Sequence, residues 1–395
     1  MEFIVFCIAG KVHKFDLIIL KMKFLNKYLR NLKPYKLASH KIWSVNSEER
    51  SNILKLDWNE ATIPPSPKVK EHLLHILNEP TFFNLYPTTY NDRLLELLSG
   101  YVGLPKDNIQ YFGSSDALHE YICKVYISVG DPVMILGPSY DNFRLTCQAN
   151  GAEVYYSNFT EEFKFDSSKF ENDIEKKEPA VVYICNPNNP TGNLHSQEYI
   201  EHLLNEFPDT LFLIDEAYYE FSSLTVKDLV LEYDNILISR TMSKAFALAN
   251  FRIGYLIASK DNVQFINRIR NPKNLSTIAQ EAAIAVLSDI GYMCDYVMEV
   301  RKARAYFIER MLQYNCSFTI YPGYGNFLLI KFSTIAEKQR LLNYLEEKNI
   351  FVRNTTQDPC LYNCFRITIG TCKQMEYVSN VIEQYYGRES QIGIF

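Results

Sequence analysis

The sequence predicts an α/β fold, in which a large domain carries a mainly parallel sheet flanked by helices and a smaller α+β domain follows it. Two observations predict the large domain: short apolar runs recur between about residues 130 and 260, and helical patterns separate them. Several of these runs are continuously apolar, which is typical of strands buried on both faces. A third observation predicts the smaller domain, because a long helical pattern and shorter strands follow residue 260.

The elements follow in this order. The strands expected in the large domain are residues 132–137, 152–157, 180–186, 210–216, 235–240 and 252–259. Beyond them we expect a long helical region at roughly 278–314, strands at 318–323 and 326–332, a helix at 336–349, strands at 350–354 and 364–370, and a last helix. These elements assign residues 56–268 to a large domain and 269–395 to a small one, with a hinge at 270–273.

The amino-terminal region is interpreted separately. Residues 34–55 are expected to form an arm that joins the small domain, and residues 1–33 an extension before it. Residues 1–21 are apolar enough to resemble a secretory signal, but charged and titratable side chains at positions 11–16 break the apolar run, and no small-residue cleavage pattern follows. The uncharged stretches are also far shorter than the roughly 20 residues that span a bilayer. We interpret residues 1–21 as a dispensable extension or an over-called start.

Composition narrows the class of function. The chain has 47% hydrophobic and 22% charged residues and a net charge of −5, which is ordinary for a soluble globular protein. The sequence shows no concentration of basic residues that would indicate a nucleic-acid-binding face. We therefore expect the protein to act on small molecules. The nine cysteines are scattered without a CxxC pair, which favours reduced thiols in a cytoplasmic protein and no metal site.

Four segments carry candidate chemistry. They are Asn186–Gly192, Asp215–Tyr219, Ser239–Phe246 and Phe365–Gly370. The first three follow or end predicted strands. Because loops at the carboxyl ends of strands build the ligand crevice of open α/β sheets, we expect these three segments to converge on one site.

The residue types in these segments suit pyridoxal phosphate (PLP) chemistry. A buried lysine amine with positive charge nearby is a good nucleophile for the cofactor aldehyde, and Lys244 fits. An acidic partner keeps the pyridine nitrogen protonated and the ring a better electron sink, and Asp215 fits. Asn189 and Tyr218 can donate to the phenolic oxygen of the ring.

A phosphate pocket is also predicted. Helix amino termini, hydroxyl groups and arginine bind anions well. Ser115 and Asp116 open a predicted helix, and Thr241, Ser243 and Arg252 add further donors.

Taken one at a time, these residues have simpler interpretations. A lysine after a strand is usually solvated, and Asp215 could cap a helix. Taken together, the right residue types in the right order at strand ends favour the cofactor site. His119 is interpreted as a packed or solvent-exposed histidine and not as a catalytic base, because Lys244 already supplies proton transfer.

The segments SKAFALA…FRIGY and NPNNPTG resemble those of the fold-type-I aminotransferases, most closely the histidinol-phosphate aminotransferase family. The resemblance runs from Pro34 to Thr371. It implies that Lys244 forms the Schiff base and moves the proton, that Asp215 meets the pyridine nitrogen, and that Asn189 and Tyr218 meet the phenolic oxygen.

The resemblance also implies roles for five further residues. Tyr140 would stack on the cofactor ring. Tyr86 would be lent by the neighbouring subunit of a homodimer to the cofactor phosphate. Arg366 would bind the substrate carboxylate, and Arg353 and Tyr35 would bind a remote phosphate of the substrate.

Three departures from the family pattern concern the substrate rather than the cofactor. The early Asn-Glu-Asn-Pro run of the family is Asn59–Thr62 here, so one amide beside the substrate entrance is missing. The usual Tyr-Pro-Asp is Tyr86–Thr88, and the Asp-Glu pair at the phosphate helix is Asp116–Ala117.

The leading hypothesis is transamination from L-glutamate to a small phosphorylated ketone or aldehyde. Imidazole acetol phosphate is what the family implies, and shorter phosphorylated ketones fit the same anion-binding pair. A PLP-dependent decarboxylase of O-phosphoserine or O-phosphothreonine stays open as an alternative. A non-catalytic PLP-fold binding protein, such as the sensor part of a transcription regulator, is a remote alternative. Such a regulator would carry a DNA-binding domain before the fold, and residues 1–33 are too short for one.

Overall fold

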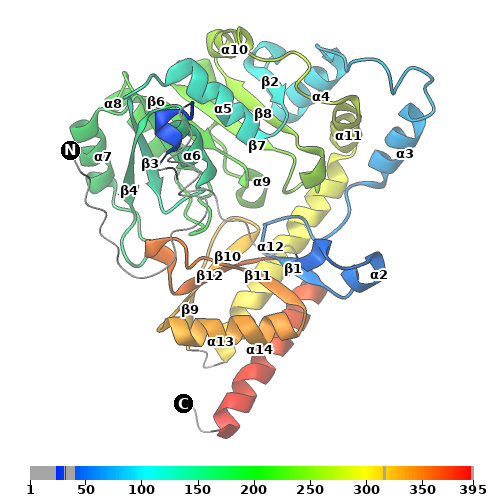
Figure 1. Ribbon diagram of the computed structural model, residues 1–395, viewed down its shortest axis with the longest axis vertical. Coiled ribbons are helices and arrows are strands. Elements are labelled where there is room, and N and C mark those ends of the chain that lie inside the picture. Colours follow the sequence, from blue (N-terminus) through cyan, green and yellow to red (C-terminus); the bar gives the residue numbers. More distant parts are fainter. Residues whose placement is uncertain (1–23, 31, 33–40, 315–316, 393–395) are drawn as a thin grey trace.

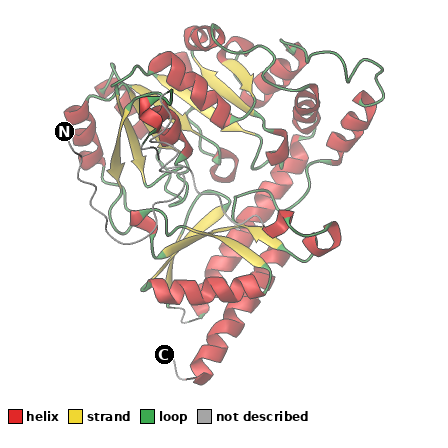
Figure 2. Ribbon diagram, viewed as in Figure 1, coloured by secondary structure: helices red, strands yellow, loops and turns green. Residues whose placement is uncertain are grey.

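The computed structural model describes residues 24–30, 32, 41–314 and 317–392 and divides into an upper and a lower part (Figure 1). Tyr35 and residues 1–21 therefore lie outside the described residues. The upper part is built on a seven-stranded sheet and the lower part on a five-stranded sheet. The colouring by secondary structure shows helices on both faces of the larger sheet and two sets of strands that face each other across the middle of the molecule (Figure 2).

The larger sheet confirms the predicted α/β class. Its strands, in spatial order, are β2 (Ile109–Phe112), β8 (Gly254–Ala258), β7 (Ile236–Thr241), β6 (Leu211–Asp215), β5 (Val181–Cys185), β3 (Pro132–Gly137) and β4 (Glu153–Asn158). All pairs are parallel except those that β8 makes with β2 and β7. Strands β5, β6 and β7 are wholly or almost wholly buried, as their continuous apolar runs predicted.

Helices cover this sheet. Those of the large domain are α3 (Pro67–Ile76), α4 (Asp92–Val102), α5 (Ser115–Tyr126), α6 (Asn142–Ala149), α7 (Ser167–Lys177), α8 (Gln197–Glu206), α9 (Tyr219–Ser222) and α10 (Lys260–Asn267). Helix α5 matters most for the site. The Ser114 side chain caps it by accepting a hydrogen bond from the Ala117 amide at 3.0 Å, which fixes its amino terminus at the carboxyl edge of the sheet.

The smaller sheet has the strand order β1 (Leu54–Leu56), β11 (Ile350–Asn354), β12 (Cys364–Thr368), β10 (Phe327–Phe332) and β9 (Phe318–Tyr321). The first strand pairs parallel with β11, so a segment from the amino-terminal region enters this sheet. Helix α13 (Ile335–Glu347) packs against this sheet, and helix α14 (Cys372–Ile392) packs against α13. A short helix α2 (Ser47–Arg50) lies beside β1.

The long helical region predicted at 278–314 is two helices, α11 (Thr277–Leu287) and α12 (Ile290–Gln313). Two side-chain hydrogen bonds mark the point of interruption. The Ser288 hydroxyl donates to the Ile284 carbonyl at 2.7 Å, and the Asp289 carboxylate accepts from the Ser66 hydroxyl at 2.5 Å. Side chains of this kind compete with the backbone hydrogen bonds of a helix. Helix α11 packs against α3 and α4 of the large domain. Helix α12 then runs from the upper part into the lower one (Figure 1).

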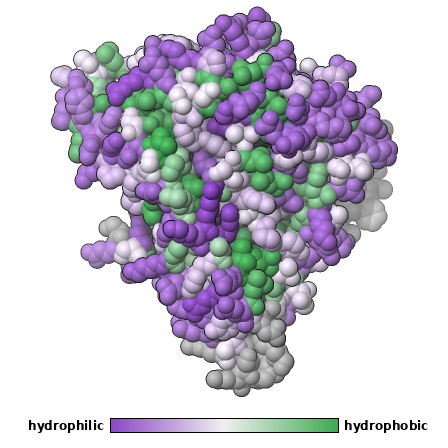
Figure 3. All heavy atoms as spheres, turned by 180° about the vertical axis from the view of Figure 1, so that it is seen from behind, coloured by the Kyte–Doolittle hydropathy of each residue, from purple (hydrophilic) through white to green (hydrophobic). Residues whose placement is uncertain are grey.

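The opposite face of the molecule is largely hydrophilic, with hydrophobic residues gathered in separate patches (Figure 3). In the part of the chain that the structure describes, no helix combines the length and apolar character needed to cross a membrane. The same residues contain no cluster of His, Cys, Asp and Glu that could hold a metal ion.

Candidate active site

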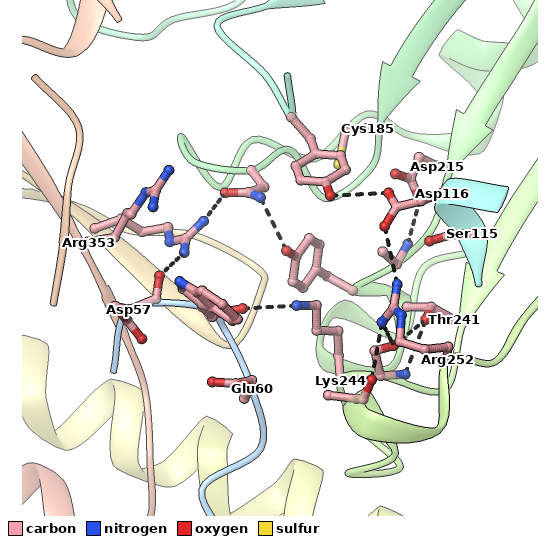
Figure 4. A pocket seen from close by; sticks show the side chains of 18 of the residues that line it. Asp57, Glu60, Ser115, Asp116, Cys185, Asp215, Thr241, Lys244, Arg252 and Arg353 are labelled. Carbon is pink, nitrogen blue, oxygen red and sulfur yellow. Dashed lines mark hydrogen bonds and ion pairs between the residues drawn. The ribbon is translucent and has the colours of Figure 1, made fainter. Parts of the chain in front are cut away.

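A cavity of about 470 Å³ lies between the carboxyl edge of the large sheet and the small domain. Figure 4 shows Arg353 on the side of the small domain, Asp215, Thr241 and Arg252 on the opposite side, and Lys244 between them. The predicted residues that line this cavity are Ser115, Asp116, Tyr140, Asn189, Asp215, Tyr218, Thr241, Ser243, Lys244, Arg252, Arg353 and Arg366. The structure therefore brings together residues that are up to 251 positions apart, from Ser115 to Arg366.

Lys244 follows β7 and points across the cavity. Its Nζ donates a hydrogen bond to the backbone carbonyl oxygen of Trp58 at 3.0 Å. Burial, together with the positive charge of Arg366, lowers the pKa of the amine to about 8. A larger fraction of the amine is therefore neutral, and nucleophilic, near physiological pH than an ordinary lysine would offer.

Asp215 ends β6 and is 3% exposed. Its Oδ2 accepts a hydrogen bond from the Tyr183 hydroxyl at 2.7 Å, and its Oδ1 accepts from the Ser239 hydroxyl and the Ala217 amide, both at 3.2 Å. Within the described residues these donors are neutral. A buried carboxylate surrounded by neutral donors at a cavity wall is suited to a cationic N–H group on a ligand.

Asn189 and Tyr218 form a connected pair in the middle of the cavity. The Asn189 amide and the Asn59 amide both donate to the Tyr218 hydroxyl oxygen, at 3.2 and 3.1 Å. Burial raises the pKa of Tyr218, so the phenol keeps its proton. With two amides donating to its oxygen, Tyr218 can still give that proton to an acceptor in the cavity.

An anion cradle lies at the amino terminus of α5. The Thr241 hydroxyl donates to Ser243 Oγ at 2.9 Å, and one Arg252 nitrogen lies 3.5 Å from the same oxygen. A second Arg252 nitrogen bonds the Asp116 carboxylate at 3.2 Å. Hydroxyl groups, a guanidinium and a helix amino terminus in one place suit a phosphate group.

Gly254 makes this cradle possible. A Cβ atom at position 254 would lie 2.3 Å from the Ser115 backbone nitrogen. Only glycine lets the start of α5 approach β8 so closely. The amino terminus of α5 is thereby held against the sheet edge that carries Thr241.

The residues present fit PLP. Lys244 offers an amine, and Asp215 offers a carboxylate that can bind a cationic group. Tyr218 offers a phenol that can donate to the ring oxygen, and the α5 cradle offers a phosphate site. These groups line one cavity, and together they supply the contacts that a ring with a phosphate arm needs. Tyr140, in the loop after β3, lines the same cavity and donates a hydrogen bond to Asp116 Oδ1 at 3.1 Å.

Two arginines form the end of the cavity nearest the small domain. Arg353 on β11 and Arg366 on β12 are directly opposite each other in the antiparallel pair. Arg366 donates to the Asn189 side-chain oxygen at 2.7 Å and to the Asp57 backbone carbonyl at 2.5 Å, so the acceptors of these two bonds are uncharged. Two guanidinium groups at one end of a cavity are well suited to bind an anionic group of a ligand.

One predicted site residue lies outside the cavity, and another is not among the described residues. Tyr86 is 80% exposed and does not line the cavity; the Lys273 ammonium lies 4.1 Å from its ring centroid. Tyr35 lies outside the described residues. The roles expected for both therefore stay predictions.

Sequence reasoning missed several residues that line the cavity, namely Trp43, Asp57, Trp58, Glu60 and Cys185. Trp58 acts through its backbone carbonyl, for which a side-chain pattern gives no signal. The difference from the family pattern at Asn59–Thr62 was the one sequence feature that pointed to this part of the cavity. Asn59 is fully buried at φ +54° and bonds both Tyr218 and Thr368, so this turn is part of the site rather than only its entrance.

Comparisons with known proteins support the same chemistry. The family model described as aminotransferase class I and II matches residues 51–382. A dihydroxyacetone phosphate transaminase of Campylobacter jejuni is 41% identical over 363 residues, covering 91% of this chain and 96% of that protein. A histidinol-phosphate aminotransferase of Ruminiclostridium cellulolyticum is 35% identical over 334 residues, covering 83% and 91%.

Among solved structures, the histidinol-phosphate aminotransferase of Sinorhizobium meliloti in complex with pyridoxal-5′-phosphate is similar, with a TM-score of 0.80. The likeness covers 92% of this chain and 99% of that chain at 23% identity. It shows that the two chains share a fold.

Proposed function

The chain belongs to the class I and II aminotransferases and is a PLP-dependent enzyme, and we propose that it transfers an amino group from L-glutamate to a small phosphorylated ketone. The observation that carries the choice of substrate is the pairing of Arg353 with Arg366 at one end of the cavity. Dihydroxyacetone phosphate is the acceptor we favour, since the relative that is 41% identical is a transaminase of that compound.

The cofactor is held, in this proposal, by the residues that line the large-domain side of the cavity. Lys244 would bind it covalently, Asp215 would hold the pyridine nitrogen, and Tyr218 and Asn189 would hold the phenolic oxygen. The residues that would hold the phosphate at the start of α5 are Ser115, Asp116, Thr241, Ser243 and Arg252. Tyr140 would stack on the ring.

When bound, PLP supplies an electron sink that stabilises negative charge at the substrate Cα. The side chains supply the rest. Lys244 would take the proton from the substrate Cα with its Nζ and deliver it again, and its lowered pKa of about 8 suits both directions of transfer near neutral pH. The Trp58 carbonyl, 3.0 Å from Nζ, orients the amine.

The arginine pair explains how one site serves two different substrates. Glutamate carries two carboxylates, and one can bind at Arg366 while the other binds at Arg353. A phosphorylated ketone has no carboxylate, but its phosphate carries a similar total negative charge and can be shared by both guanidinium groups. The cavity thus matches the charge of the donor and of the acceptor with the same two side chains.

The test compares matched acceptors on enzyme loaded with pyridoxamine phosphate. Dihydroxyacetone phosphate, imidazole acetol phosphate and unphosphorylated dihydroxyacetone would be added, and the amino product and the cofactor spectrum followed. We expect Arg353→Gln to lower kcat/KM for phosphorylated acceptors by roughly 100-fold and to affect dihydroxyacetone little, since a bidentate charged contact is lost. The control is Arg268→Gln, because Arg268 is an exposed arginine at the end of α10. It should not change kcat/KM for either kind of acceptor.

Equal loss with phosphorylated and unphosphorylated ketones would contradict the proposed acceptor class. The wild-type enzyme should also convert L-glutamate to its keto acid in the first half-reaction. If no amino donor reacts, and carbon dioxide is released from O-phosphothreonine or O-phosphoserine, the decarboxylase alternative replaces the proposal.

A further inference from the structure

A chain of buried side chains reaches Asp215 from outside the cavity. His119 Nε2 on α5 lies 2.9 Å from Ser239 Oγ on β7, and that hydroxyl donates to Asp215 Oδ1 at 3.2 Å. Tyr183 on β5 donates to the other carboxylate oxygen at 2.7 Å. His119, Ser239 and Tyr183 have no exposed surface, and none of them lines the cavity.

The protons in this chain can be assigned by counting donors. A serine hydroxyl has one proton, and Ser239 uses it on Asp215. Ser239 must therefore accept from His119, so Nε2 of His119 carries a proton. His119 Nδ1 is buried and has no hydrogen-bond partner in the described part of the chain, so a proton there would be costly. The ring is the Nε2–H tautomer, and every proton along the chain is directed toward Asp215.

Aromatic packing fixes the imidazole in this orientation. The His119 ring lies edge-on to Phe143 and Tyr183, with centroids 5.6 and 5.8 Å away. Phe143 and Tyr183 are themselves stacked at 4.8 Å. The ring that bonds Ser239 and the phenol that bonds Asp215 are thus held in one rigid cluster beneath the carboxylate.

We propose that His119, acting through Ser239, is a positioning residue that keeps Asp215 an ionised, oriented carboxylate facing the pyridine nitrogen of the cofactor. This inference rests on the proposed function, because that nitrogen belongs to PLP. Hydrogen bonds donated to a carboxylate lower its affinity for a proton. A proton shared between Asp215 and the ring nitrogen therefore stays on the nitrogen, and the protonated ring is the stronger electron sink.

The test uses three variants that separate hydrogen bonding from packing. Ser239→Ala removes the link, and His119→Phe keeps an aromatic ring without a donor. His119→Gln offers an amide donor in place of the imidazole. His195→Phe is the matched control, because His195 is also buried among aromatic rings but makes no contact with Asp215.

The decisive readout is the ¹⁵N resonance of the pyridine nitrogen in protein loaded with ¹⁵N-labelled PLP. In Ser239→Ala and His119→Phe it should move toward the unprotonated form, with kcat lower by roughly 10-fold and KM little changed, the loss expected for one buried hydrogen bond. His119→Gln should restore much of both, and His195→Phe should leave the resonance in place. In the cofactor-free wild type, ¹⁵N-histidine spectra should show His119 protonated on Nε2 alone.

An unchanged pyridine resonance in both Ser239→Ala and His119→Phe would overturn the inference, whatever their thermal stability, and His119 would be a packed core histidine. A protonated Nδ1 in the cofactor-free protein would overturn it as well. Failure of the wild-type protein to take up the labelled cofactor would instead contradict the proposed function, before any variant is compared.

Discussion

Arg366 and Lys244 line the same cavity, and the positive charge of Arg366 adds to burial in lowering the pKa of the Lys244 amine to about 8. Removing that charge should raise the pKa, although burial, the larger cause, remains. We expect Arg366→Met to shift the titration of Lys244 to higher pH and Arg366→Lys, which keeps a positive charge, to shift it less. Competitive acetylation of the cofactor-free protein across pH, read by peptide mass spectrometry, measures this.

A titration of Lys244 that is unchanged in Arg366→Met would show that burial alone sets the pKa. A midpoint near that of an ordinary lysine in the wild type would contradict the assignment of a lowered pKa of about 8 to this amine. Both outcomes bear on how Lys244 acts as a nucleophile, since only the neutral amine attacks.

Much of the fold could be predicted from the sequence because buried parallel strands are continuous apolar runs. Strand β3 lies at the predicted residues 132–137, and β5, β6 and β7 lie within a residue of prediction. Strand β2 was missed because Ile109–Phe112 is four residues long, too short a pattern to distinguish. The interruption between α11 and α12 was missed because one of the two bonds at this point, from Ser66 to Asp289, joins distant segments of the chain.

For the site, local motifs identified the residues that follow strands, and twelve of the predicted side chains line one cavity. The sequence did not predict how these residues contact one another in space. The opposition of Arg353 and Arg366 depends on the register of β11 with β12, and the bond from Lys244 to Trp58 depends on a backbone carbonyl. No local sequence pattern indicated the bond between His119 and Ser239, because the two residues are 120 positions apart.

A second prediction concerns the buried ion pair between Glu216 and Arg240, which join the segments Asp215–Tyr219 and Ser239–Phe246. Their side chains are 0% and 1% exposed with a nitrogen–oxygen distance of 2.8 Å, and the guanidinium lies 3.6 Å from the Tyr219 ring centroid. Arg240→Met should destabilise the protein by about 3–5 kcal/mol, because it leaves Glu216 charged and buried. Denaturant unfolding of the cofactor-free protein measures the loss.

The control is the double variant Glu216→Gln/Arg240→Met. It contains no unpaired buried charge, so it should be less destabilised than Arg240→Met alone. If the two variants lose the same stability, packing around Arg240, and not its charge, would be the main contribution of the pair.

A third prediction uses Glu220 on α9. Burial raises the pKa of this carboxyl from 4.5 to about 8, and Arg240 only partly offsets the shift. The folded protein then binds a proton that the unfolded chain releases, so this contribution to stability is complete below pH 4.5 and is lost as the pH rises through 8. We expect Glu220→Gln to gain stability relative to wild type as the pH is raised across that window.

Unfolding midpoints at a series of pH values between 4.5 and 8 compare the two proteins. The difference should be smallest at the acidic end and grow steadily toward the basic end. A difference that does not change with pH would mean that Glu220 is ionised in the folded protein throughout, stabilised by the charge of Arg240 and the hydrogen bond from Tyr101.

The last prediction concerns Tyr86, which we propose reaches the cofactor phosphate of a neighbouring subunit. Its segment exposes several large apolar side chains, with Phe83 78%, Leu85 64%, Tyr86 80% and Tyr90 57% exposed. Exposed apolar residues gathered in one segment favour a protein interface. In a two-fold dimer, whatever one subunit contributes to its partner it also receives, so each of two sites would contain one Tyr86 and one Lys244 from different chains.

Mixing two inactive variants tests this arrangement. Lys244→Ala removes the covalent attachment, and Tyr86→Ala is assayed at a cofactor concentration too low to load it. If Tyr86 acts across the interface, a mixed dimer of these variants contains one site with both residues intact. Random reassembly of equal amounts should then restore about a quarter of the wild-type activity. If Tyr86 acts within its own chain, every site carries a defect, and the mixture stays as inactive as its components.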